Sequence, residues 1–140
     1  MMFKTILNAN DGSEPAFRAF ALALKLAKQN QSALHMICVE ELPNLADFIE
    51  EVKDATALAE RRFEVVRRRA LDQAAAADVS VQIHVVVGHP VRDIVQFASD
   101  LKAELLVIGA TGHSAFYERM IGSRADRIMQ LASCPVMVVK

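Results

Sequence analysis

Short apolar runs alternate with longer amphipathic segments along the whole chain. The apolar runs cover residues 3–10, 32–40, 79–88, 103–109 and 134–140. Each run is nearly continuous in its apolar residues, which is typical of strands that are buried on both faces of a sheet. The pattern therefore predicts five strands.

Four segments between these runs repeat their apolar residues every three or four positions, which predicts four helices. The first covers residues 14–30, and the second is predicted as a single helix through the apolar positions between residues 59 and 74. The third begins at Pro90, because the first turn of a helix tolerates a residue without an N–H group. The fourth covers residues 123–132.

Strands that alternate with helices are joined by crossovers, which make neighbouring strands parallel and place helices on both faces of the sheet. With 140 residues, 53% of them hydrophobic, the chain fits one domain, residues 1–140. The predicted class is α/β with an open parallel sheet. Ligands bind to such sheets beyond the carboxyl ends of the strands, where the strand order reverses. We therefore expect the functional groups in the loops after the first and fourth strands.

Charge and composition exclude several classes of function. A net charge of -1 gives no general attraction to nucleic acid or to an anionic membrane, and the apolar runs are too short to span a bilayer. The arginine-rich stretch 61–69 has acidic residues at helical pair spacing, so we expect a solvated face. Cys38 and Cys134 lie far apart without zinc-binding spacing, which favours a reduced, cytoplasmic setting. We expect no leader peptide, because no charged segment precedes an apolar stretch of the required kind. We expect no metal site, because His35 and His84 lie on predicted strands.

Three of the five glycines lie around the connection after the fourth strand. Gly109 ends that strand and allows a ligand to approach the backbone, while Gly112 can adopt the positive φ that turns the chain. Gly122 and Ser123 open a helix, where unpaired N–H groups and the positive end of the helix dipole favour an anion. Two interpretations stay open at this point: a phosphate cradle, or a simple turn followed by a helix cap.

The spacing of these residues, G-x2-G-x9-G-S, resembles the ATP-binding signature of the universal stress protein family. The resemblance extends over essentially the whole chain, through "ILNANDGSEPAFRAFALALKLAK", "LHMICVEE", "VVVGHPVRDIVQFA" and "CPVMVV". It implies a Rossmann-like sheet of five parallel strands in the order 3-2-1-4-5, with ATP and magnesium bound across the point where the order reverses. It also implies a homodimer formed through the C-terminal strand.

The resemblance assigns eight residues to the nucleotide. Asp11 matches the family's first-strand aspartate, which contacts ribose or adenine, although an Asx turn before the first helix is an equally good role. Met36 matches the position whose backbone meets adenine. The long side chain of Arg124 either adds charge at the phosphates or points to solvent. The full set is Asp11, Met36, Ile108, Gly109, Gly112, Gly122, Ser123 and Arg124.

No catalytic group can be identified in the sequence. The residue before Ser123 is Gly122 instead of the lysine of a Walker A loop, so the chain is not a P-loop ATPase. His113, Glu118 and Arg119 lie within the long connection and are expected to be solvated. We therefore predict a nucleotide-binding regulatory module of the stress response. Slow ATP hydrolysis or phosphate transfer at the same site, and a dimeric interaction module without nucleotide, stay open as alternatives.

Overall fold

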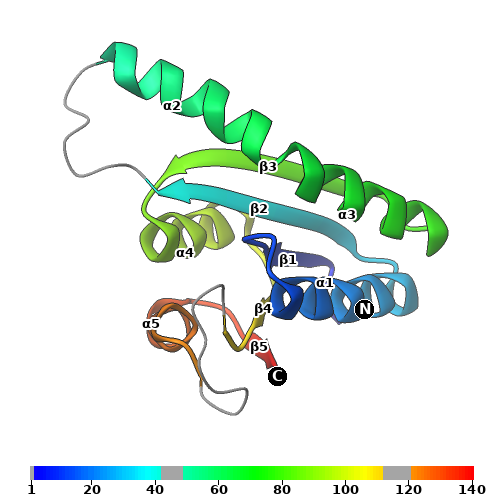
Figure 1. Cartoon of the computed structure of the whole chain (residues 1–140). Helices are drawn as coiled ribbons and strands as arrows, with labels where there is room; N and C mark the ends of the chain where they lie inside the picture. The colour runs from blue at the N-terminus through cyan, green and yellow to red at the C-terminus, as the bar shows by residue number, and fades with distance from the viewer. Residues whose placement is uncertain (1, 42–48, 112–120) are drawn as a thin grey trace.

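A computed structural model of the chain describes residues 2–41, 49–111 and 121–140. Strands and helices alternate through these residues, as the hydrophobic pattern predicts (Figure 1). In chain order the elements are β1 (Thr5–Ala9), α1 (Glu14–Asn30), β2 (Ala33–Glu41), α2 (Ile49–Arg62), α3 (Glu64–Ala76), β3 (Val81–Gly88), α4 (Pro90–Leu101), β4 (Leu105–Gly109), α5 (Ser123–Leu131) and β5 (Val136–Val139).

The strands form one parallel sheet in the order β3-β2-β1-β4-β5, which confirms the predicted class and strand order. The central strand β1 pairs with β2 on one side and with β4 on the other, so that Ile6 lies beside Leu34 and Leu105. The chain therefore leaves β1 and β4 toward opposite sides of the sheet. Such a reversal opens a crevice at the carboxyl ends of the two strands.

Helices cover both faces of the sheet (Figure 1). On one face α1 and α3 bury a core that includes Phe17, Phe20 and Ala70 against β1, β2 and β4. On the other face α4 and α5 pack Ile94 and Ile128 against the same strands. Successive residues of a strand point to opposite faces, so each buried strand contributes to both cores. No helix in the described ranges is long and apolar enough to cross a membrane.

The second predicted helix is wrong in one respect, because the segment forms two helices that meet at Phe63. The backbone at Phe63 has φ -87° and ψ 2°, which lies outside the α-helical well. Hydrogen bonds of helical spacing continue across this point, from Phe63 N–H to the Ala59 carbonyl and from Arg67 N–H to the Phe63 carbonyl. The Phe63 side chain is buried in the core beneath α3. Apolar periodicity does not reveal such a kink, because the spacing of the buried residues is unchanged.

Candidate functional site

A cleft of about 580 Å³ lies at the carboxyl edge of the sheet. It is bounded by the ends of β1, β2 and β4 and by the first turns of α4 and α5. Six of the eight predicted residues line it, although they come from distant parts of the chain: Asp11, Ile108, Gly109, Gly122, Ser123 and Arg124. Gly112 lies outside the described residues.

The eighth predicted residue, Met36, does not line the cleft. Its side chain is fully buried in the core that α1 and α3 cover. Ile37 and Val39 line the cleft from β2 instead. These two residues were missed in the sequence, where alternation along the strand is the signal that places them on the face opposite Met36.

The loop between β1 and α1 is built from its own polar side chains. The Asn10 Oδ1 accepts a hydrogen bond from the Gly12 N–H at 2.8 Å, and the Asp11 Oδ1 accepts one from the Ser13 N–H at 3.0 Å. Gly12 has a φ of 87°, which favours glycine. The Ser13 Oγ then caps α1 by accepting from the Ala16 N–H at 3.3 Å. Asp11 thus forms an Asx turn and also lines the cleft, so the two roles considered for it are compatible.

The first turn of α5 has no such cap. Gly122 is the N-cap residue, with φ -65° and ψ 156°, and it has no side chain that could cap the turn. Ser123 is the first helical residue and does not act as the cap. N–H groups at an uncapped helix start favour an anion, because they are unpaired donors at the positive end of the helix dipole. Gly122, Ser123 and Arg124 all line the cleft here.

The space around Gly109 and Gly122 differs, so the two glycines have different roles in the fold. A Cβ atom on Gly109 would lie 2.8 Å from the Pro15 carbonyl carbon and 3.0 Å from the Ala16 nitrogen. Gly109 therefore allows α1 to approach β4 closely, in addition to any approach by a ligand. A Cβ atom on Gly122 would meet the Ala110 oxygen only at 3.4 Å. Neither a positive φ nor the described neighbours require glycine at position 122, although glycine is a better N-cap residue than alanine.

The Arg124 side chain reaches toward β2. Its Nη2 donates to the Glu41 Oε2 at 3.0 Å, and both side chains are more than half exposed. The arginine therefore lines the cleft and carries its charge at the cleft's edge. The ion pair was not predicted, since the two residues are 83 positions apart.

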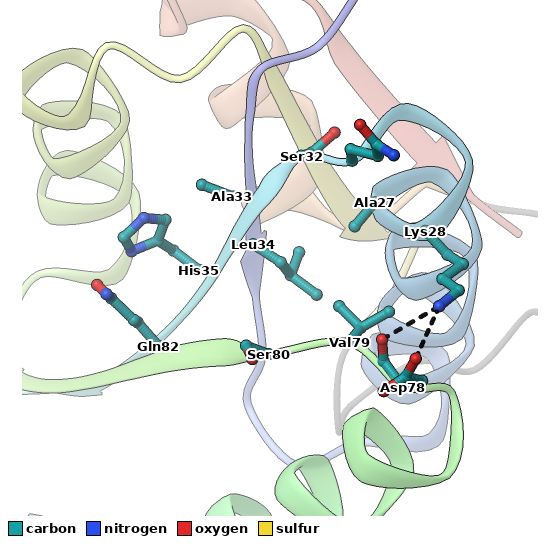
Figure 2. Close-up of a pocket in the computed structure, with 11 residues that line it drawn as sticks. Ala27, Lys28, Ser32, Ala33, Leu34, His35, Asp78, Val79, Ser80 and Gln82 are labelled. Atoms are coloured by element: carbon teal, nitrogen blue, oxygen red, sulfur yellow. Dashed lines mark hydrogen bonds and ion pairs between the residues drawn. The ribbon is translucent and has the colours of Figure 1, made fainter.

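A second hollow, of about 440 Å³, lies at the amino edge of the sheet (Figure 2). It is lined by the end of α1 and the starts of β2 and β3, and none of the eight predicted residues belongs to it. In Figure 2, Lys28 at its rim is joined to Asp78, with 3.1 Å between Nζ and Oδ2. Because α1 ends at this hollow, its helix dipole does not favour an anion there, whereas the first turn of α5 at the cleft does.

His35, beside this hollow, meets His84 on β3. The His35 Nδ1 lies 3.1 Å from the His84 Nε2, and the rings stack with 5.3 Å between their centres. Burial lowers the pKa of both imidazoles, and the charge of His84 lowers the pKa of His35 further. The contact was not expected from the sequence, because it depends on the register that sets β2 beside β3. Within the described ranges, no group of three or more His, Cys, Asp or Glu side chains is placed to hold a metal ion.

Comparison with known proteins gives a consistent result over the whole chain. The model of the universal stress protein family matches residues 2–140. A universal stress protein of Thermus aquaticus is 32% identical over 139 residues, which cover 99% of this chain and 100% of that protein. The structure of UspA from Lactobacillus plantarum matches with a TM-score of 0.83 at 23% identity, covering 100% of this chain and 99% of that one. A universal stress protein crystallised in complex with cAMP matches with a TM-score of 0.76 at 25% identity, covering 100% and 99%.

Proposed function

The chain belongs to the universal stress protein family, and from this premise we propose that it is a cytosolic regulatory module that binds an adenine nucleotide, ATP with magnesium. One observation carries the proposal. Six residues predicted from the sequence converge on a single cleft, and the uncapped first turn of α5 opens into the same cleft. The related protein crystallised with cAMP supports an adenine nucleotide as the ligand class.

The lining of the cleft suits the two ends of a nucleotide. Ile37, Val39 and Ile94 supply an apolar surface of the kind that receives a flat base. The first turn of α5 supplies N–H donors for phosphate oxygens, and Ser123 adds a hydroxyl there. We therefore propose that the base lies toward β2 and the phosphates toward α5.

We propose that magnesium binds in the cleft together with the phosphates. The ion retains several waters and is held by phosphate oxygens together with one or two carboxylates. The carboxylate of Asp11 and the hydroxyl of Ser123 are the oxygen groups on the cleft that suit it. When bound, the ion would offset the charge of a triphosphate.

We propose binding rather than turnover as the role of the cleft. Its described lining contains neither lysine nor histidine, and its one carboxylate, that of Asp11, is the group proposed for magnesium. A general base needs a side chain within reach of the attacking water. A nucleotide bound beside the first turn of α5 would instead change the surface there, and a protein partner can recognise that change.

The test is calorimetric titration of the nucleotide-stripped protein with AMP and with ATP and magnesium. Gly122→Val should weaken binding by at least about tenfold, because its branched side chain enters the space beside the α5 amides. Ala57→Val, on the exposed face of α2, is the matched control and should bind as the wild type does. If the folded wild type binds neither nucleotide in the millimolar range, the proposal fails and a dimeric interaction module becomes the better account.

We further propose a homodimer formed through β5, which lies at the edge of the sheet. The Leu106 and Ala110 N–H groups donate to the carbonyls of Pro135 and Val139. Because hydrogen bonding alternates between the two sides of a strand, the polar backbone groups of Val138 face away from β4 and can pair with a second copy. An isologous contact of two such edges makes a closed dimer.

Val138→Pro tests the dimer, because proline removes the outward N–H group while sparing the bonds to β4. Val138→Ala keeps that N–H group and serves as the control. Light scattering after size exclusion should give a dimer for the wild type and for Val138→Ala, and a monomer for Val138→Pro. A folded Val138→Pro variant that stays dimeric contradicts the contact, with circular dichroism as the check on folding.

A further inference from the structure

An ion pair links two walls of the cleft. Arg124 is the second residue of α5, and its Nη2 lies 3.0 Å from the Oε2 of Glu41, the last residue of β2. β2 contributes Ile37 and Val39 to the cleft, while α5 contributes its first turn. The pair therefore joins the wall proposed for the base to the wall proposed for the phosphates.

The carboxylate of Glu41 is on the cleft side of the sheet because of its position in the strand. Side chains two residues apart share a face, so Glu41 follows Ile37 and Val39, which line the cleft. The neighbouring Glu40 belongs to the opposite face, where it pairs with Arg62 of α2. Two adjacent carboxylates thus have equal charge and different surroundings, which makes one a control for the other.

Arg124 is the one basic residue in the described lining of the cleft. In this structure its guanidinium is engaged by Glu41. A phosphate chain that reaches the guanidinium must compete with this carboxylate and must also approach its negative charge. The repulsion increases with the charge of the ligand, so it acts more strongly on a triphosphate than on a monophosphate.

We propose that Glu41 is a specificity-determining residue that lowers the affinity of the cleft for nucleoside triphosphates relative to monophosphates, by holding Arg124 and by repelling the added phosphates. This inference rests on the proposed nucleotide site. It goes beyond that proposal by assigning the preference among AMP, ADP and ATP to a side chain outside the glycine motif. It also gives the exposed ion pair a role other than stability, to which exposed pairs contribute little.

The experiment measures the dissociation constants of AMP and ATP, with and without magnesium, for the wild type and four variants. Glu41→Gln should raise the affinity for ATP about two- to fivefold more than the affinity for AMP, since an exposed pair contributes an interaction of this size. Glu40→Gln removes the same charge from the other face and should leave the ratio unchanged. Arg124→Gln should weaken ATP binding more than AMP binding. In the Arg124→Gln background, Glu41→Gln should change the ratio of ATP affinity to AMP affinity less than it does in the wild type, because no guanidinium remains to be freed.

Added salt supplies an independent readout. The difference between Glu41→Gln and the wild type should decrease from low salt to high salt, because exposed charges are screened. If Glu41→Gln shifts AMP and ATP equally, or weakens ATP, the inference is overturned while nucleotide binding stands. If the folded wild type and Glu41→Gln bind neither nucleotide, the proposed function itself fails and the inference fails with it. Glu41 is well exposed, so the variant is expected to fold, and its melting temperature checks this.

Discussion

Replacement of Gly109 by alanine tests whether the first glycine of the motif is needed by the fold itself. The added Cβ atom would lie 2.8 Å from the carbonyl carbon of Pro15, 2.9 Å from its oxygen and 3.0 Å from the nitrogen of Ala16. All three are backbone atoms in the first turn of α1, so no side-chain rotation relieves the contact. The helix cannot retreat freely, because Phe17 and Phe20 anchor it in the core.

The expected loss of stability follows from two opposing effects. Overpacking of this kind costs about 1–3 kcal/mol, while alanine reduces the freedom of the unfolded chain and returns roughly 0.4–1 kcal/mol. Gly109 does not have a positive φ, so backbone strain adds nothing. The net change of about 1–2 kcal/mol corresponds to a fall in melting temperature of roughly 3–8 °C for a domain of this size.

Thermal unfolding followed by circular dichroism measures the change, with Gly122→Ala as the companion variant. At Gly122 the added Cβ atom meets the Ala110 oxygen at 3.4 Å, an ordinary contact, and φ is -65°. That variant should lose only about 0.5–1 kcal/mol, because alanine is a poorer N-cap residue, which lowers the melting temperature by roughly 1–4 °C. A Gly109→Ala protein that melts within about 1 °C of the wild type would refute the reasoning, because α1 would then have room to move.

Three further predictions concern buried polar groups. Asn8 is fully buried and its Nδ2 donates to the Val107 carbonyl, so Asn8→Asp should destabilise the protein by about 3 kcal/mol at neutral pH. The loss should be smaller in acid, where the new carboxyl group is protonated. An unchanged midpoint of urea unfolding would contradict this. Burial lowers the pKa of His35 and of His84 below the ordinary value of 6.5. As the pH drops through 6.5, these imidazoles are therefore protonated in the unfolded chain before they are protonated in the folded protein, and the free energy of unfolding should fall. Urea titrations of His35→Gln/His84→Gln should show a smaller pH slope, and an equal slope is the contrary result. Burial, with a smaller contribution from the charge of Asp11, raises the pKa of the Cys38 thiol to about 12, so alkylation followed by mass spectrometry should label it only after unfolding; rapid labelling of the folded protein would contradict this.

The α/β class and the location of the cleft could be predicted from the sequence because they depend on local patterns and on topology. Apolar runs that alternate with amphipathic segments determine a parallel α/β sheet. The glycine motif then identifies the loop beside the point where the strand order reverses. The strand order itself came from the family resemblance, and it is confirmed by the pairing of β1 with β2 and β4.

The remaining features depend on contacts between residues that are distant in the sequence. Helical periodicity is preserved across Phe63, so it predicts one helix where the backbone forms two. The pairing of Arg124 with Glu41 requires the relative placement of α5 and β2, which no local pattern encodes. Met36 was predicted for its backbone only, and alternation along β2 places its side chain in the core, opposite the cleft-lining Ile37.

The end of β1 carries two buried asparagines. Asn8 and Asn10 are buried where an apolar strand would ordinarily continue, and burial of an amide is unfavourable unless it is hydrogen-bonded. The Nδ2 of Asn8 ties β1 to the Val107 carbonyl of β4, and the Oδ1 of Asn10 supports the turn at Gly12. The Asn8 Oδ1 and the Asn10 Nδ2 have no hydrogen-bond partner among the described residues. The Asn10 amide thus supports the loop that borders the cleft, while the Asn8 amide joins β1 to β4 in the core. We infer that the hydrogen-bonded loop after β1 forms a fixed border of the cleft, and that the selectivity of the cleft is adjusted at its exposed edge by Glu41 and Arg124.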